Sequence, residues 1–158
     1  MIDGQDNNNF EAITQEMENM YLNFIVGNEI YGIEIRYVLQ IVGLQKINEM
    51  PEMDYSLKGY IDLRGSIIPV YSMHIRFGKP EPEYSERTCI IIVMIDDKQI
   101  GLIVDAIEET TIIEPHIISP TPSASETDTK PYIKGVARLA EEHNVVLLYA
   151  EYLFDSGY

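Results

Sequence analysis

The sequence predicts an all-β fold, built as a barrel or a sandwich. About ten short apolar or alternating runs follow one another with turn residues at short intervals, the pattern of small antiparallel sheets. Long stretches with helical periodicity are almost absent, which argues against alternating βα units. No exact internal repeat is apparent. Each half nevertheless has an apolar hairpin associated with glycine, which would suit two similar small barrels.

The length and composition fit one compact domain or two small subdomains that share a core. The chain has 158 residues, and 46% of them are hydrophobic. No apolar run approaches the length that crosses a membrane. The acidic, polar start of the chain does not resemble a signal peptide. The single cysteine, Cys89, excludes an internal disulfide and fits a reducing cytoplasm, and its apolar neighbours predict a buried, inert thiol.

The net charge of -15 limits the classes of partner. A chain this acidic is repelled by nucleic-acid phosphates and by anionic lipid surfaces. We therefore expect neither nucleic-acid binding nor direct membrane insertion. Solubility alone explains such a charge, and so does a partner with a basic face.

The first part of the chain is expected to be flexible and then to form strands. Residues 1–20 are read as a flexible acidic N-terminus, with either a short helix or a frayed segment over 10–20. A Gly27-Asn28 turn should join the first two strands into a hairpin. Strands are predicted at 21–26, 29–35 and 41–42, with a helical turn at 36–40 and a loop at 43–56 that could contain one strand near 45–47.

The stretch from Gly59 to Gly78 predicts two short strands around a tight turn at Arg64-Gly65. Gly65 supplies the backbone freedom that the turn needs, and Pro69 makes the second strand an edge strand or a bulged one. A short helix at 73–77 should end at Gly78. Arg64 is then either a solvated turn residue paired with Asp62 or a contact for a partner.

The second half of the chain shows the same succession of short strands and turns. Residues 79–86, with two prolines and three glutamates, are the best boundary between the halves. Residues 88–95 form a continuous apolar run that predicts a buried strand. Further strands are expected at 99–105 and 106–113, a long loop at 115–130, a closing hairpin from 132–139 and 144–149, and a helical turn at 150–154.

The residues that usually carry catalysis or metal binding form no recognisable motif. There is no phosphate-binding glycine loop, zinc spacing or nucleophile elbow. His74, His116 and His143 are far apart in the sequence and are expected at the surface or in loops. Adjacent glutamates such as Glu108 and Glu109 should face opposite sides of a strand and so form no dyad. We therefore expect no enzyme activity, metal, nucleotide or cofactor.

The stretch around the Arg64 turn resembles the signature of the CheW family, the adaptors of bacterial chemotaxis. The match is carried by Gly59, Leu63, Arg64, Gly65, Pro69 and Val70. Further blocks with the same order and spacing are YGIEIRYVLQIV, IGLIVDAIEE, YIKGVARL and NVVLLYAEYLF. The resemblance covers nearly the whole chain, over residues 21–154.

The resemblance implies an architecture of two small, five-stranded, SH3-like β-barrel subdomains that share an apolar core, with short helices at the termini. In this chain the subdomain halves would be about 21–80 and 87–154, with terminal segments exchanged between them. It also implies a non-enzymatic adaptor that couples chemoreceptors, the methyl-accepting chemotaxis proteins, to the histidine kinase CheA. The expected partners are the CheA regulatory domain and the cytoplasmic receptor tip. The free protein would be a cytoplasmic monomer, recruited to receptor arrays at the membrane.

The same resemblance assigns candidate contact residues. The receptor tip would lie in a groove lined by Gly59, Arg64, Gly101, Ile107 and Gly135. The kinase would contact Leu22, Ile35, Val38 and Ile41. From the residues alone, the four apolar side chains could equally be core, because strand alternation does not place all four on one face. The glycines could equally serve only the backbone geometry.

Four positions depart from the family pattern and indicate a divergent member: Asp62, Ser72, Gln40 and Ala106. Gln40 stands where a glutamate is frequent, which removes a salt bridge to Arg64. One alternative is a CheW-like scaffold for a non-flagellar chemosensory pathway, such as one that controls pili or second-messenger synthesis. Another, from a different class, is a small acidic β-barrel enzyme or ligand binder with Arg64 as the anchor for an anion.

Overall fold

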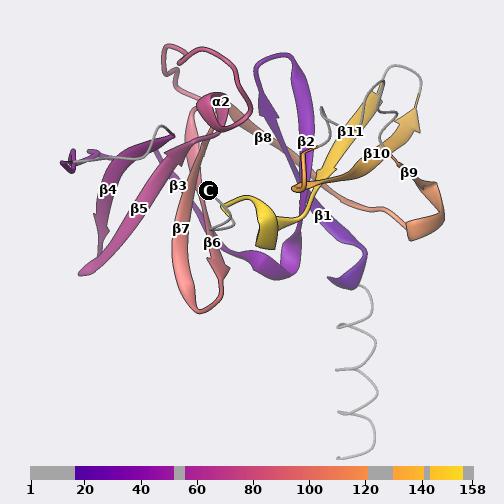
Figure 1. Cartoon of the computed structure of the whole chain (residues 1–158), viewed down its shortest axis with the longest axis horizontal. Helices are drawn as coiled ribbons and strands as arrows, with labels where there is room; N and C mark the ends of the chain where they lie inside the picture. The colour runs from indigo at the N-terminus through magenta and orange to yellow at the C-terminus, as the bar shows by residue number, and fades with distance from the viewer. Residues whose placement is uncertain (1–16, 52–55, 121–129, 141–142, 155–158) are drawn as a thin grey trace, which may run out of the picture.

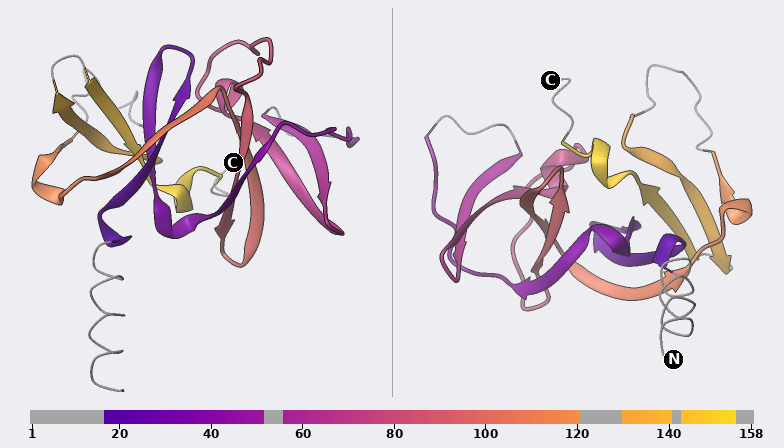
Figure 2. Two further views of the ribbon diagram at one scale, coloured as in Figure 1. Left: turned by 180° about the vertical axis from the view of Figure 1, so that it is seen from behind. Right: turned by 90° about the horizontal axis from the view of Figure 1, so that it is seen from below.

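The computed structural model describes residues 17–51, 56–120, 130–140 and 143–154. Of the helix or frayed segment expected at 10–20, residues 10–16 lie outside this range, and Met20 already begins a strand. Within the described residues, no helix is long and apolar enough to cross a membrane. The strands form two curled sheets side by side, as Figures 1 and 2 show. The predicted all-β fold with two small barrels is confirmed.

One sheet contains the first and last strands of the chain, and we call it the terminal sheet. Strand β1 is almost entirely buried and pairs with β2 across the Gly27 turn. Strand β11 runs parallel to β2, whereas the other neighbours are antiparallel. Its order is β8 (Ala106–Ile112), β1 (Met20–Val26), β2 (Glu29–Glu34), β11 (His143–Leu148), β10 (Ile133–Ala140) and β9 (Ile118–Ser119).

The other sheet, which we call the middle sheet, is built from the strands between them. The apolar run expected at 88–95 becomes β6, which lies between two neighbours and is almost entirely buried. Strand β5 runs parallel to β7, which repeats the parallel pair of the terminal sheet. The order is β3 (Val38–Gly43), β6 (Cys89–Ile95), β7 (Lys98–Val104), β5 (Ser66–Ser72) and β4 (Leu57–Leu63).

Helix is confined to short connections. Helix α2 (Met73–Arg76) begins where the Ser72 hydroxyl accepts a hydrogen bond of 3.2 Å from the Ile75 amide, and Gly78 follows it with a positive φ of 79°. The predicted helix at 73–77 is therefore present. Single 3-10 turns are η1 (Ile35–Tyr37), η2 (Pro115–Ile117) and η4 (Ala150–Tyr152).

The two sheets are built on the same plan. In the middle sheet, Val70 of β5 pairs with Gly59 on one side and Gly101 on the other. In the terminal sheet, Leu147 of β11 pairs in the same way with Gly135 and Gly32. A parallel central pair, an antiparallel hairpin on each side and a glycine at the same level therefore occur in both sheets.

The opening hairpin of each half is exchanged between the sheets. Strands β1 and β2 belong to the terminal sheet, although the rest of their half, β3 to β5, forms the middle sheet. Strands β6 and β7 open the second half of the chain but belong to the middle sheet, whereas the rest of that half, β8 to β11, forms the terminal sheet. Only Asp105 separates β7 from β8, and one residue is too short to reverse the chain into the same sheet. Each sheet therefore combines strands from both halves of the chain.

The core follows from this exchange. A central cluster between the sheets is formed by side chains such as Phe24, Ile33, Met73, Ile91 and Leu102, all fully buried. A second cluster fills the middle sheet, around Ile61, Val70 and Ile92. A third fills the terminal sheet, around Tyr21, Val145 and Leu147. The shared apolar core between two barrels is therefore present.

Candidate functional site

Arg64 lies at the tip of the β4–β5 hairpin, in a two-residue turn with Gly65. Both residues have positive φ angles, 52° and 89°, and such a backbone suits the second residue better than the first, because arginine has a Cβ atom. The Gly65 amide donates a hydrogen bond of 3.0 Å to Oδ1 of Asp62. Within the described residues, no ion pair or hydrogen bond involves the exposed Arg64 guanidinium. The pairing of Arg64 with Asp62 that the sequence allowed is therefore not formed.

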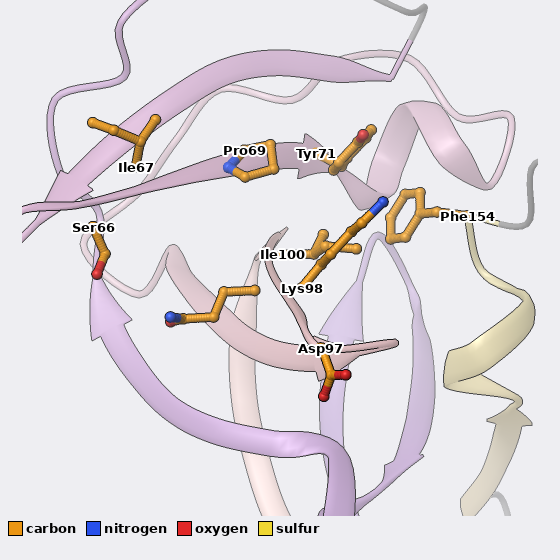
Figure 3. A pocket seen from close by; sticks show the side chains of 9 residues that line it. Ser66, Ile67, Pro69, Tyr71, Asp97, Lys98, Ile100 and Phe154 are labelled. Carbon is orange, nitrogen blue, oxygen red and sulfur yellow. The ribbon is translucent and has the colours of Figure 1, made fainter.

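A pocket of about 610 Å³ opens beside this hairpin, between β5 and β7. Figure 3 shows side chains of both strands facing it, with Lys98 reaching toward Tyr71 and the ring of Phe154. The rings of Tyr71 and Phe154 are 4.2 Å apart. The pocket therefore combines apolar side chains with polar ones, among them the ammonium group of Lys98 and the carboxylate of Asp97. Its main side chains are those of Ile67, Pro69, Tyr71, Lys98, Ile100 and Phe154.

Two of the predicted receptor-binding glycines, Gly59 and Gly101, lie at one level of the middle sheet, on either side of Val70. A Cβ atom at Gly101 would lie 2.6 Å from Cγ1 of Val70, and one at Gly59 would lie 2.2 Å from the carbonyl oxygen of Asn48. Both glycines therefore serve close packing, which is the alternative that the sequence left open for them.

The other two predicted receptor-binding positions, Ile107 and Gly135, belong to the terminal sheet. Ile107 is half-buried in β8, opposite Phe24, and packs against the central core. A Cβ atom at Gly135 would lie 2.5 Å from the carbonyl oxygen of Ser119. In Figure 1 the strands that carry Gly59 and Gly135, β4 and β10, lie on opposite sides of the molecule. The five positions are therefore divided between the middle and the terminal sheet.

The predicted kinase-binding residues differ in exposure. Leu22 is only 4% exposed and is part of the central core, so it offers no surface to a partner. Ile35 and Val38 are half-buried and pack against the same core. Ile41, on β3, is 43% exposed. For Leu22, the structure favours the core alternative that the sequence left open.

Sequence analysis missed Leu39, a neighbour of Ile41 with 49% of its surface exposed. Strand β3 is at the edge of the middle sheet, so one side of its backbone has no partner strand. A bulge interrupts its pairing with β6 between Val38 and Gln40. Residues two apart in a regular strand share a face, whereas Leu39, Gln40 and Ile41 are all exposed here, so alternation alone does not predict this edge. The exposed apolar edge is a ready surface for a partner strand or barrel.

Two of the three histidines differ from the surface or loop positions that were expected. His74 is only 8% exposed in α2, and its Nε2 lies 2.9 Å and 2.8 Å from the two carboxylate oxygens of Asp105. His143 is half-buried at the start of β11, 3.3 Å from Glu108. Only His116 has the exposed position that was predicted. The Asp105 carboxylate compensates the energetic cost of burying the polar His74 ring, because it pairs with that ring.

The expectation that Glu108 and Glu109 face opposite sides of a strand is also wrong. Their carboxylate oxygens and a ring nitrogen of His143 all lie within 4.8 Å of one another. The physical reason is a bulge in β8, where Asn23 of β1 faces both glutamates.

Cys89 is half-buried, and burial raises the pKa of its thiol, which fits the inert cysteine that was expected.

Comparison with known proteins places these features in a family. The model of the CheW-like domain matches residues 20–157. The chemotaxis protein CheW of Klebsiella aerogenes is 29% identical over 131 residues, which cover 83% of this chain and 76% of that protein. The chemotaxis protein CheW of Bacillus subtilis is 30% identical over 115 residues, which cover 73% and 74% of the two chains.

A solved structure agrees with these relatives. The crystal structure of the scaffolding protein TtCheW from Thermoanaerobacter tengcongensis superimposes with a TM-score of 0.77 and 32% sequence identity. The superposition covers 88% of this chain and 94% of that one. Because the family model spans almost all of the described residues and the fold agrees, this chain belongs to the CheW-like domain family.

Proposed function

We propose that this protein is a non-enzymatic adaptor that couples chemoreceptors to the histidine kinase CheA in a chemosensory pathway. Relatives named as chemotaxis and scaffolding proteins support the general role. Two separate surfaces support the coupling role, because an adaptor must hold two partners at once. In this proposal the free protein is a cytoplasmic monomer that joins receptor arrays through its partners.

The exposed Arg64 is the observation that carries the receptor-binding part. Arginine is a poor choice for a position with a φ of 52°, where asparagine, aspartate or glycine would cost less. Strained residues of this kind persist where function requires them. A guanidinium without an internal partner among the described residues can form bidentate hydrogen bonds with a carboxylate of a receptor. The adjoining apolar pocket can accept a side chain from the same partner.

The edge strand β3 supports the kinase-binding part. Leu39 and Ile41 expose apolar surface beside unpaired backbone groups. A homologous barrel, such as the regulatory domain of CheA, can add to such an edge through main-chain hydrogen bonds and bury the side chains. The kinase contact is therefore proposed at Ile41 and Leu39, and Leu22 acts only through the core.

The alternatives call for different partners. A scaffold for a non-flagellar pathway would use the same two surfaces, with another receptor or output. A small-molecule binder with Arg64 as anion anchor would use the pocket of about 610 Å³ beside the hairpin.

Binding measurements on four variants test the adaptor proposal. Ile41→Asp should weaken binding to the purified CheA regulatory domain at least tenfold, because it places a charge in an apolar contact. Ile112→Asp is its control, since Ile112 is 58% exposed on the edge strand of the other sheet. Arg64→Ala should weaken binding to a receptor-tip fragment, whereas Arg138→Ala, which removes an exposed arginine of β10, should not.

The two contacts should also separate. Ile41→Asp should leave receptor binding intact, and Arg64→Ala should leave kinase binding intact. If the wild-type chain binds neither partner, the adaptor proposal is wrong, and a screen for bound carboxylates tests the ligand-binding alternative. If Ile41→Asp and Ile112→Asp weaken kinase binding equally, β3 is not the contact.

A further inference from the structure

One group of metal-ligating side chains lies away from both proposed contacts, in the terminal sheet. It consists of Glu108, Glu109 and His143, whose ligand atoms lie within 4.8 Å of one another. The glutamates come from β8 and the histidine from β11, two strands that are not neighbours in the sheet. The group therefore joins two separate strands at a partly exposed place, where the glutamates are accessible and the histidine is half-buried.

A β-bulge creates this arrangement. Leu22 pairs with Thr110 and Phe24 with Ile107, so Asn23 alone faces both glutamates. The extra residue breaks the alternation that would point adjacent side chains to opposite faces. Two carboxylates held together in this way repel each other, and bringing a cation between them removes that repulsion.

The histidine adds an observation that the carboxylates alone do not supply. Nε2 of His143 is buried from solvent, and within the described residues it has no hydrogen-bond partner of good geometry. Oε1 of Glu108 is nevertheless only 3.3 Å away. A buried, unpaired ring nitrogen is costly unless something coordinates it. Nitrogen at this place also favours a transition metal over calcium or magnesium, which bind oxygen.

The other sheet provides an internal comparison. It has a bulge at the same level, where Leu39 and Gln40 take the places of Glu108 and Glu109. Ser66, the residue that closes its hairpin, takes the place of His143. The shared plan therefore does not require ligands at these positions, and all three metal-ligating side chains occur in one sheet only.

We propose that Glu108, Glu109 and His143 bind one divalent cation of the zinc class, which links β8 to β11. The ligand set of one imidazole and two carboxylates, with room for water, is typical of open zinc sites. Ligands around such a cation lie roughly 3.4 Å apart, for bonds of about 2.1 Å, so the side chains need only small rotations. The cation would brace the terminal sheet and would not take part in catalysis. This proposal replaces the expectation from sequence that no metal binds.

Calorimetric titration of the full-length, chelator-treated protein with Zn²⁺ tests the site. The wild type should bind one equivalent, and its melting temperature should rise by a few degrees. Glu109→Gln and His143→Asn should each weaken Zn²⁺ binding at least tenfold. The matched control is His116→Asn, because exposed His116 also lies 3.3 Å from a glutamate, Glu114, but has no second carboxylate beside it. This control should bind Zn²⁺ like the wild type.

Three results would overturn the proposal. One is the absence of stoichiometric Zn²⁺ binding by the wild type. Another is an equal loss in His143→Asn and His116→Asn, which would indicate adventitious binding to surface histidines. The third is binding of Mg²⁺ as tight as that of Zn²⁺ and unaffected by His143→Asn, which would indicate a purely acidic site. NMR spectra of the imidazoles give a second readout, because Zn²⁺ should shift the ring signals of His143 and leave those of His116 in place.

Discussion

Nε2 of His74 lies 2.8 Å from Oδ2 of Asp105, and this pair connects the two sheets. His74 is in α2, which directly follows β5 of the middle sheet. Asp105 is the single residue between β7 of the middle sheet and β8 of the terminal sheet. The same carboxylate oxygen accepts a hydrogen bond of 2.8 Å from the amide of Gly27, in the turn between β1 and β2. The pair therefore lies where the chain passes from the exchanged hairpin β6–β7 in the middle sheet to β8 in the terminal sheet.

Removal of this carboxylate should loosen the junction between the sheets. Asp105→Ala leaves the largely buried His74 ring and the Gly27 amide without their acceptor, and we expect a loss of about 1–3 kcal/mol in the free energy of unfolding. Urea denaturation at neutral pH measures it. Glu86→Ala, at an exposed carboxylate, should change stability by less than about 0.5 kcal/mol. A loss equally small in Asp105→Ala would show that the junction is held by packing alone.

The strands were predictable from sequence because their signals are local. Three signals each depend on residues close in the chain: the largely apolar stretches Tyr21–Val26 and Cys89–Ile95, and the Gly65 turn. The exchange of hairpins depends on the parallel pairs β2–β11 and β5–β7, which join segments far apart in sequence. No local pattern encodes such pairing, so the residues predict the strands but not the order of the strands in the two sheets.

The candidate contacts were predictable to a smaller extent. Arg64 was placed correctly at an exposed turn, since Gly65 marks that turn in the sequence. Leu22 and Ile41 are equally apolar, and only the three-dimensional packing distinguishes the core residue from the exposed one. The bulge that groups Glu108 and Glu109 breaks the alternation on which the prediction of opposite faces depended. Irregular pairing therefore limited the sequence analysis at both places.

The glycines at the level of Val70 should matter for folding rather than for contact. In Gly101→Ala the new Cβ would lie 2.6 Å from Cγ1 of Val70 and 2.9 Å from Cγ2 of Ile90, and such overpacking costs about 1–3 kcal/mol. Gly43→Ala is the control, because a Cβ there meets no atom within 4 Å. It should be neutral or slightly stabilising. Thermal unfolding compares the two, and an unchanged melting temperature in Gly101→Ala would refute the packing role.

The stability should fall at alkaline pH through Tyr31. Burial, and then the hydrogen bond of 2.7 Å that its hydroxyl donates to Glu29, raise the pKa of Tyr31 above the ordinary value of 10.0. Above about pH 10 the unfolded chain loses this proton while the folded chain keeps it, so the free energy of unfolding decreases as pH rises. Tyr31→Phe keeps the ring stacked on Phe77 but has no proton to lose.

Urea unfolding at about pH 8 and about pH 11 measures this effect. The wild type should lose more stability between the two pH values than Tyr31→Phe does, because other tyrosines contribute equally to both proteins. Equal losses in the two proteins would mean that the titration of Tyr31 is not linked to folding.

Substitution of Arg64 should weaken receptor binding without lowering stability. Its φ of 52° disfavours any side chain with an ordinary Cβ, so Arg64→Ala should leave stability within about 0.5 kcal/mol of the wild type. Arg64→Asn gives the Asn-Gly pair that this two-residue turn prefers, and it should stabilise the protein by a few tenths to about 1 kcal/mol. Both variants lack the guanidinium, so both should lose receptor-tip binding at least tenfold. Differential scanning calorimetry and a binding titration on the same samples measure the two effects. A destabilised Arg64→Ala would show that Arg64 has a structural role, and full receptor binding by both variants would show that it is an ordinary exposed arginine.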